Sequence, residues 1–107
     1  MADRKQLGQA NPGATPASIY SPGTNLKSRK MVLYVSETSG VDKTWSLYHD
    51  DNGTTYDDTT ALYVTIAILA STTTTITLDF EMSAGNLAVA GSTTDVTFTL
   101  YGEEVAA

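Results

Sequence analysis

The feature that most constrains this chain is a strict alternation of polar and apolar side chains over residues 75–82, Thr-Ile-Thr-Leu-Asp-Phe-Glu-Met. A period of two with every apolar residue on one parity is typical of a half-buried antiparallel strand. The same alternation returns at residues 96–100, Val-Thr-Phe-Thr-Leu. Threonine, of which the chain has eighteen, suits the exposed face of such strands because its branched Cβ fits a pleated surface. The sequence therefore predicts an all-β protein with hydroxyl-rich sheet faces.

Further strands follow at short spacing, and no useful length of the chain has the helical period of 3.6 residues. Residues 30–35 carry apolar side chains on both parities, which predicts a central strand covered on both faces. About seven strands with such spacing are typical of an antiparallel β-sandwich of immunoglobulin-like or jelly-roll type, and the spacing does not separate these two topologies. The predicted strands are a short one at 18–21, followed by 30–35, 43–48, 59–69, 73–82, 87–90 and 95–101.

Shared parity within each predicted strand also indicates which side chains face the core. In residues 59–69, for example, the even positions from 62 to 68 are all apolar. The predicted core consists of Met31, Leu33, Val35, Trp45, Leu47, Leu62, Val64, Ile66, Ile68, Ile76, Leu78, Phe80, Val96, Phe98 and Leu100.

Residues 1–25 differ in composition from the rest of the chain. They contain all three prolines, three of the eight glycines and few large apolar side chains. Proline fixes φ and lacks a backbone donor, glycine adds chain entropy, and such a segment cannot build a core alone. We therefore expect an extended N-terminal arm over residues 1–25 and a β-sandwich body over residues 26–107.

Charge is also divided along the sequence. Residues 1–30 contain five cations and one Asp, a net charge of +4, whereas residues 31–107 contain one Lys and eleven acids, a net charge of −10. An acidic body repels phosphates, so we expect no nucleic-acid partner. A basic arm favours an acidic neighbour, and we predict that Arg4, Lys5 and Leu7 bind a partner. The alternative is a solubilising leader that contacts nothing.

Length and composition exclude several other classes. The 107 residues suit one domain with one modest core, and the absence of cysteine excludes disulfides and thiolate chemistry. The start lacks the apolar region of a signal peptide, and the longest apolar run, 61–70, is too short to span a bilayer. We expect a protein made in a cytoplasm, without a membrane partner.

A small β-protein without disulfides often gains stability by oligomerisation, and we expect a homotrimer.

One group of residues has the chemistry of a general base. His49, the only histidine, precedes Asp50 and Asp51, and a His–Asp pair can activate a nearby nucleophile. A histidine at a strand end beside a polar turn is the simpler explanation, because nothing in the spacing supplies the converging partners. We therefore predict no catalytic residues, no cofactor and no enzyme activity.

Two other groups of residues have the chemistry of binding sites. Residues 50–58 contain four Asp and one Asn, which are ligands suited to Ca²⁺, but they lack the spacing of an EF-hand and fit turn formation. We predict no metal site. Aromatic rings can stack on sugars, yet the same rings serve at protein interfaces with their hydroxyls kept wet, and we favour the interface. The tyrosines concerned are Tyr34, Tyr48, Tyr56, Tyr63 and Tyr101.

Both ends of the chain carry a resemblance to a known group of proteins. Residues 3–14, Asp-Arg-Lys-Gln-Leu-Gly-Gln-Ala-Asn-Pro-Gly-Ala, and residues 95–105, Asp-Val-Thr-Phe-Thr-Leu-Tyr-Gly-Glu-Glu-Val, resemble segments of small virion proteins of tailed bacteriophages. The turn at residues 20–23, Tyr-Ser-Pro-Gly, is similar to the turn that follows the arm in that group. The resemblance implies a non-enzymatic structural component of a phage particle, present in many copies.

Three functions follow as hypotheses. The first is a capsid decoration or cement protein that binds the head surface, bridges neighbouring capsid subunits and has the major capsid protein or other virion proteins as partners. The second is a tail or baseplate component. The third, from a different class, is a carbohydrate-binding surface module, which needs an exposed aromatic platform or a groove beside the loop at 50–58. The first two place the protein in the virion.

Overall fold

The computed structural model describes residues 4–107, which form eight β-strands and no helix. None of these residues therefore lies in a helix of the length and hydrophobicity that crossing a membrane requires. The strands are β1 (Lys5–Ala10), β2 (Ala17–Tyr20), β3 (Leu26–Glu37), β4 (Lys43–Asp50), β5 (Ala61–Ile68), β6 (Thr73–Leu78), β7 (Asn86–Gly91) and β8 (Val96–Ala106).

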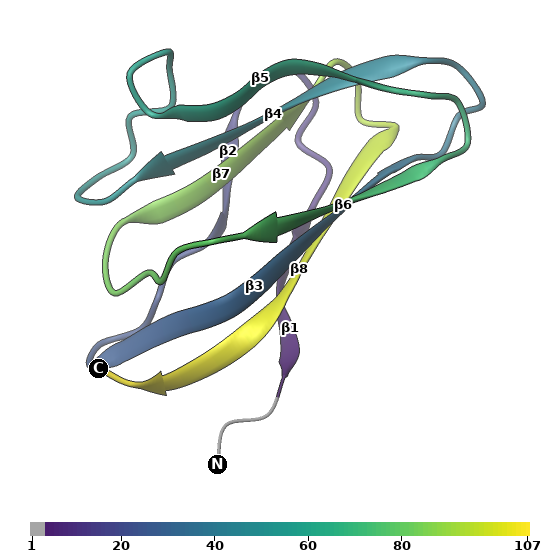
Figure 1. The fold of residues 1–107 in the computed structure, drawn as a ribbon. Helices are drawn as coiled ribbons and strands as arrows, with labels where there is room; N and C mark the ends of the chain where they lie inside the picture. Colours follow the sequence, from purple (N-terminus) through teal and green to yellow (C-terminus); the bar gives the residue numbers. More distant parts are fainter. Residues whose placement is uncertain (1–3) are drawn as a thin grey trace.

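The strands lie in two four-stranded antiparallel sheets (Figure 1). The first sheet has the order β1-β8-β3-β6 and the second the order β2-β7-β4-β5. Every connection except β4–β5 passes from one sheet to the other, so most hydrogen-bonded neighbours are far apart in sequence. This arrangement confirms the all-β class and is compatible with the predicted β-sandwich.

The two sheets share one hydrophobic core, with Leu33 and Phe98 from the first sheet and Trp45 and Leu47 from the second. Parity correctly assigned most of its members, because every second side chain in the central parts of β3 and β8 is buried and the ones between are partly or fully exposed. The predicted core residues that are buried are Met31, Leu33, Val35, Trp45, Leu47, Ile68, Leu78, Val96, Phe98 and Leu100, and Ile76 and Phe80 pack against them half-buried.

The prediction was wrong for three residues of β5. The exposed fractions are 45% for Leu62, 50% for Val64 and 38% for Ile66. β5 is one of the two edge strands of its sheet, and its pairing with β4 contains two register irregularities that break the regular alternation. At one of them Thr65 has a φ of 51°, and its N–H donates to the Ser46 hydroxyl at 3.0 Å. The core instead gains Ile19, Tyr20, Met82, Leu87 and Val89.

The N-terminal segment also differs from the sequence-based expectation. Residues 5–10 form β1, which pairs with β8, and residues 17–20 form β2, which pairs with β7. Ile19 and Tyr20 are buried in the core. The first strand therefore begins at Lys5, whereas the first predicted strand began at residue 18. Each of the two sheets includes one strand from this N-terminal segment.

The composition of this segment misled the prediction because its stability comes from partners distant in sequence. A Cβ built on Gly8 would collide with the carbonyl oxygen of Ile19, so the absence of a side chain lets β1 and β2 approach closely. The three prolines lie outside β1 and β2, where no sheet hydrogen bond is lost. The predicted boundary at residue 25 falls in the turn between β2 and β3.

Glu37, the last residue of β3, is a buried carboxylate that joins two loops. It accepts hydrogen bonds from the backbone N–H groups of Ser39 at 2.8 Å, Gly40 at 2.8 Å and Ser71 at 3.1 Å. Burial acts to raise the pKa of Glu37, but the hydrogen bonds from Ser39, Ser71 and Gly40 outweigh it and lower the pKa to about 2. The carboxylate thereby fixes the β3–β4 loop to the β5–β6 loop.

Candidate functional site

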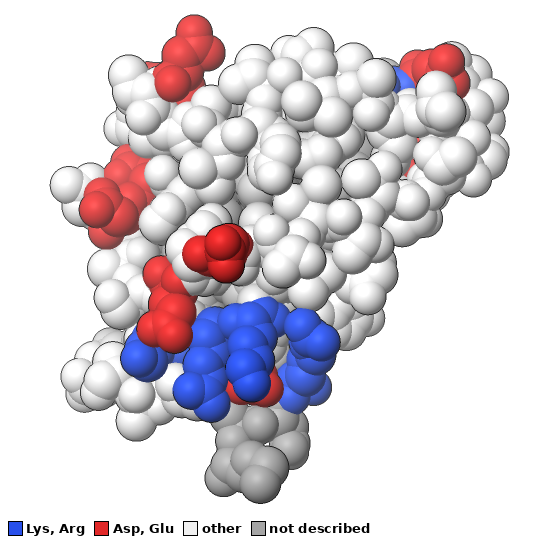
Figure 2. Space-filling view, in the orientation of Figure 1, with Lys and Arg blue, Asp and Glu red and all other residues white. Residues whose placement is uncertain are grey.

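Five of the six cationic side chains gather at one end of the first sheet (Figure 2). Strand pairing explains why, since β8 lies between β1 and β3. Lys5 of β1 pairs with Gly102, and Arg29 of β3 pairs with Glu103, so the same segment of β8 brings two basic segments together. We call this group the basic cluster; its members are Arg4, Lys5, Lys27, Arg29 and Lys30.

A backbone irregularity in β3 shapes the centre of the basic cluster. The register with β8 shifts between Arg29 and Val32, and Lys30 has a φ of 54°. The Arg4 guanidinium donates a hydrogen bond to the Lys30 carbonyl oxygen at 3.1 Å. The bulge therefore turns the Lys30 side chain outward, and it is 66% exposed.

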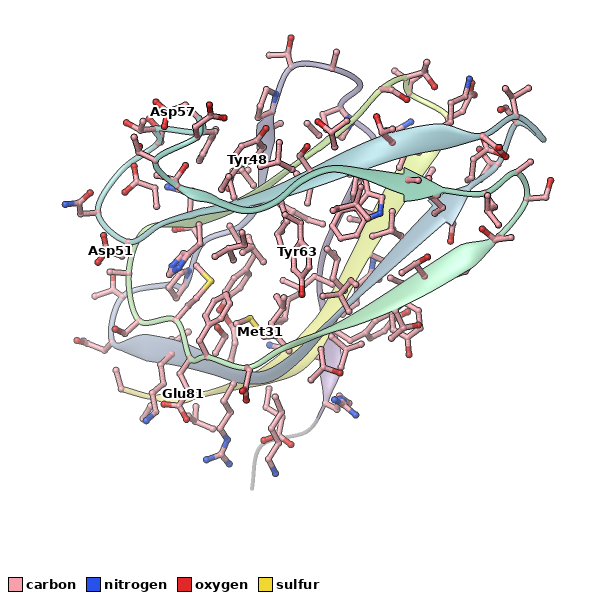
Figure 3. All side chains as sticks on the ribbon, turned by 45° about the horizontal axis from the view of Figure 1, so that its top comes forward. Met31, Tyr48, Asp51, Asp57, Tyr63 and Glu81 are labelled. Carbon is pink, nitrogen blue, oxygen red and sulfur yellow. The ribbon has the colours of Figure 1, made fainter. Side chains whose placement is uncertain are left out.

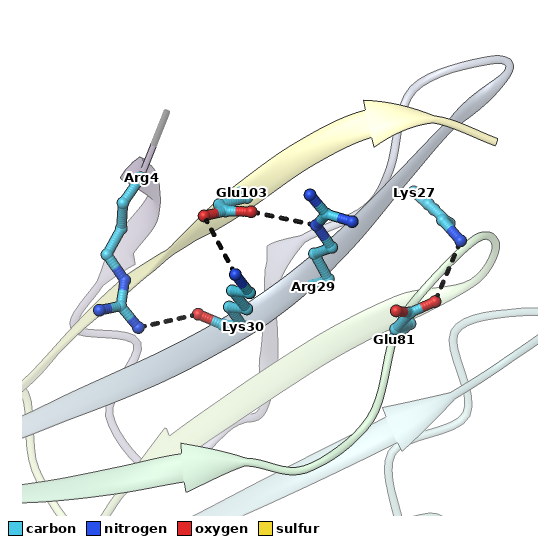
Figure 4. Close-up of polar contacts among 6 residues, drawn as sticks. All are labelled: Arg4, Lys27, Arg29, Lys30, Glu81 and Glu103. Carbon is cyan, nitrogen blue, oxygen red and sulfur yellow. Dashed lines mark hydrogen bonds and ion pairs between the residues drawn. The ribbon is translucent and has the colours of Figure 1, made fainter. Parts of the chain in front are cut away.

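Ion pairs hold several of these cations in place (Figure 4). Arg29 Nε lies 3.0 Å from Glu103 Oε1, and Lys27 Nζ lies 3.2 Å from Glu81 Oε1. Lys30 Nζ is 4.0 Å from the other Glu103 oxygen, at the limit of an ion pair. Partly exposed pairs of this kind add little stability, so their main effect is to orient the charged groups.

An open groove of about 770 Å³ runs beside the basic cluster. Its lining includes the cationic residues Arg4, Arg29 and Lys30, and Leu78 and Phe80 add apolar surface. The other lining residues are Met31, Val32, Thr77, Asp79, Glu81 and Glu103. The lining therefore combines three cations and three acidic residues with apolar side chains, and a carboxylate-bearing segment of another protein has favourable contacts there only with cations that stay exposed, such as Lys30.

Lys5 belongs to a network that ties the N-terminal strands to β8. Glu104 accepts a hydrogen bond from the Tyr20 hydroxyl at 2.7 Å and pairs with Lys5 Nζ at 2.9 Å. The hydrogen bonds from Tyr20 and then from Lys5 lower the pKa of Glu104. Burial, together with the Glu104 charge, raises the pKa of Tyr20.

The three residues predicted to bind a partner have different positions in the structure. Arg4 and Lys5 belong to the basic cluster, whereas Leu7 packs half-buried against the core. The prediction omitted Lys27, Arg29 and Lys30 as site residues. The sequence feature that could have indicated these three residues is the positive charge of residues 1–30, because residues 27–30 contribute to it together with residues 4–5. Partner binding by Arg4, Lys5 and Leu7 stays a prediction.

The structure does not bring His49 and the neighbouring carboxylates into one constellation. The His49 ring stacks on Phe80, with centroids 5.0 Å apart and planes at 15°. The Asp50 carboxylate instead accepts hydrogen bonds from the backbone N–H groups of Asn52 at 3.1 Å and Thr55 at 2.8 Å. Asp50 therefore organises the loop that follows it, in the way Asp commonly does in turns.

Asp57 has a similar role in the same loop. Its carboxylate accepts hydrogen bonds from the Thr59 hydroxyl at 2.6 Å and the Thr59 N–H at 2.8 Å, which lower the pKa of Asp57. Among residues 4–107, no three or more His, Asp and Glu side chains form a group that could hold a metal ion.

The tyrosines fall into separate groups. Tyr34 and Tyr101, on the first sheet, pack edge to face at 5.6 Å between centroids. The ring centroids of Tyr48 and Tyr56 lie 6.5 Å apart near the loop that carries Asp57. Tyr63 packs against the buried Trp45, with ring centroids 5.3 Å apart and planes tilted by 41° (Figure 3). The predicted tyrosines thus do not form one continuous aromatic platform for a sugar.

Comparisons of the chain with protein-family models and with curated proteins found no match.

Proposed function

We propose that this protein is a non-enzymatic structural protein of a tailed-bacteriophage particle, a capsid decoration or cement protein that binds the head surface. The observation that carries the proposal is the basic cluster. An otherwise acidic molecule with a net charge of −6 presents five of its six cations at one end, beside a groove that is partly apolar. The resemblance of both chain ends to phage virion proteins is the reason for proposing a phage particle as the assembly to which the protein binds.

In this proposal the basic cluster binds an acidic segment of the major capsid protein or of another virion protein. Lys30 and Arg4 contact the carboxylates of the partner, since both line the groove and the Lys30 side chain is 66% exposed. The ion pairs of Arg29 and Lys27 keep the surface ordered before the partner arrives, which reduces the entropy lost on binding.

We also propose that the fold is of the jelly-roll type rather than immunoglobulin-like. Eight strands in two four-stranded sheets, with every pair of consecutive strands except β4 and β5 in opposite sheets, support this choice. Immunoglobulin constant-type domains have seven strands in sheets of four and three. Fold type does not assign function, so the basic cluster and the resemblance carry the functional proposal.

The binding experiment uses particles that lack this protein. Purified protein is added to them, and bound copies are measured by sedimentation at several salt concentrations. Lys30→Glu reverses a cation whose side chain is 66% exposed, and we expect binding about tenfold weaker, a change of about 1.4 kcal/mol. Binding of the natural protein should also weaken with salt, because exposed charges are screened over about 8–10 Å.

A matched control changes the net charge by the same two units in an exposed loop away from the basic cluster. The double variant Asn52→Asp/Thr54→Asp serves this purpose, and we expect it to bind like the natural protein. Equal binding by Lys30→Glu and the natural protein would refute docking through the basic cluster. Electron cryomicroscopy of the reconstituted particles then locates the added density: density on the head supports a decoration protein, and density on the tail supports the tail alternative.

A further inference from the structure

The loop between β4 and β5 contains an asparagine followed directly by a glycine, Asn52-Gly53. Asn52 is exposed and follows Asp51, which lies at the margin of the molecule (Figure 3). An Asn-Gly pair between two strands often forms a type I′ turn, which needs a positive φ at the glycine. Gly53 is not among the residues with a positive φ. The backbone conformation of this loop therefore does not require a glycine at this position.

An asparagine side chain can react with the backbone of the residue that follows it. The nitrogen of that residue forms a bond to the Asn Cγ, the bond from Cγ to Nδ2 breaks, and the peptide N–H proton leaves with the amide as ammonia. Water then opens the resulting succinimide ring at either of its two C–N bonds. One opening gives aspartate, and the other gives isoaspartate, in which the chain continues through Cγ. Glycine favours ring closure because it has no Cβ and a flexible backbone.

The structure holds the peptide on both sides of the reacting atoms and leaves these atoms free. The Asn52 N–H donates to Asp50 Oδ1 at 3.1 Å. The Gly53 carbonyl oxygen accepts from Asn86 Nδ2 at 2.8 Å. Within residues 4–107, neither the Asn52 side-chain amide nor the Gly53 N–H has a hydrogen-bond partner. No hydrogen bond of either reacting group therefore has to break before the Gly53 nitrogen attacks the Asn52 Cγ.

Two of the other three asparagines are poorly suited to the same reaction. Asn11 precedes Pro12, whose nitrogen carries no hydrogen. Asn25 precedes Leu26, whose N–H donates to the Gly23 carbonyl oxygen at 3.1 Å. Ring closure at Asn25 would have to break that hydrogen bond and would place a branched side chain beside the ring.

Asn86, the remaining asparagine, is held by its side chain. Its Nδ2 donates to the Gly53 carbonyl oxygen at 2.8 Å, and its Oδ1 accepts from the Ser18 hydroxyl at 2.8 Å. The residue that follows, Leu87, is completely buried in the core. Ring closure at Asn86 would therefore break two hydrogen bonds and displace a core residue of β7.

We infer that Asn52 deamidates spontaneously through a succinimide formed with Gly53, while the other asparagines of the folded protein stay intact. Either product adds one negative charge to a molecule whose formal net charge is −6. Isoaspartate also adds one carbon atom to the backbone directly before Gly53, whose carbonyl oxygen contacts Asn86. The inference concerns the chemistry of this loop and does not depend on the proposed function.

The test follows the purified full-length protein during incubation at mildly alkaline pH, where the Gly53 amide proton is removed faster. Cleavage after Tyr48 and Tyr56 then releases residues 49–56, in which Asn52 is the only asparagine. We expect this peptide to gain about 1 Da, the difference between OH and NH2, and to separate into an aspartate and an isoaspartate form. A synthetic peptide of residues 49–56, incubated in parallel, gives the rate of the reaction without the fold.

The variant Gly53→Ala tests the role of the glycine. A Cβ at Gly53 would lie 3.3 Å from Asp50 Oδ2, a contact that a small movement of this side chain relieves. We therefore expect the variant to fold, and its reaction at Asn52 to be at least about tenfold slower. An unchanged rate would contradict attack by the Gly53 nitrogen.

The natural protein decides the inference even if Gly53→Ala does not fold. An Asn52 that is still intact when half of the synthetic peptide has reacted would overturn it, because the fold would then hold the reacting atoms apart. Earlier reaction at Asn25 or Asn86 would overturn the selectivity for Asn52. Formation of aspartate without isoaspartate would exclude the succinimide.

Discussion

Replacing Tyr20 by Phe tests whether the N-terminal strands are an integral part of the fold. The Tyr20 ring is buried, and its hydroxyl donates to a Glu104 oxygen at 2.7 Å across the two sheets. A hydrogen bond to a charged group contributes about 1.5–3 kcal/mol, and partial exposure of this one favours the lower half of that range. We therefore expect Tyr20→Phe to reduce the free energy of unfolding by about 1.5–2 kcal/mol and the Tm by about 6–8 °C.

The assay is urea unfolding followed by the fluorescence of Trp45, the single tryptophan, which is 1% exposed in the folded protein. The variants Tyr20→Phe, Glu104→Gln and their combination form a double-mutant cycle. We expect a coupling free energy of about 1 kcal/mol, since the hydroxyl loses its charged acceptor when Glu104 is replaced. Tyr34→Phe, at a tyrosine that is 40% exposed, is the control and should change stability by less than about 0.5 kcal/mol.

The pH dependence of this coupling has a defined sign. The folded-state pKa of Glu104 is lowered from its ordinary value of 4.5, so the stabilisation is present above that value and is lost as the pH falls below it. Additivity of the two single changes within about 0.3–0.5 kcal/mol at neutral pH would refute the reasoning. It would mean that the contact between β2 and β8 does not hold the N-terminal segment in place.

Two other substitutions test contacts that join distant parts of the chain. Because the hydrogen bonds to Glu37 lower its pKa to about 2, its carboxylate stabilises the fold above pH 4.5 and this contribution is lost as the pH falls toward about 2. Glu37→Gln should remove that part of the acid sensitivity, measured by urea unfolding across this range, and an unchanged pH profile would contradict it. Gly8→Ala should lower the Tm, because its Cβ would collide with the Ile19 carbonyl oxygen; an unchanged Tm would show that β1 and β2 can separate without cost.

The sequence was sufficient to predict the all-β class and much of the core. Alternation is a local property, and in β3 and β8 it follows the regular pleat, so Leu33 and Phe98 were placed correctly. In β5 the apolar residues do not alternate with polar ones, and parity alone could not show whether another layer covers them. Their exposure is decided by the position of β5 at the edge of its sheet and by its bulges, which depend on strand order.

The N-terminal segment shows the same limit for a different reason. Its few apolar residues and its prolines correctly indicated that it cannot fold alone. β1 and β2 form because β8 and β7 offer them hydrogen-bond partners, and these strands lie far away in sequence. Composition reports local preference and carries no information on such pairing.

The basic cluster depends on both the composition of the chain and its tertiary structure. The sequence by itself determined that the first thirty residues are basic and the remainder acidic, because formal charge depends on composition alone. Only the tertiary structure decided that Arg4 and Lys5 lie beside Arg29 and Lys30, since antiparallel pairing of β1 and β3 with the same end of β8 brings them together. The groove lies beside the bulge in β3, where the register with β8 shifts, and strand pairing of this kind joins residues far apart in sequence and cannot be found in any local pattern.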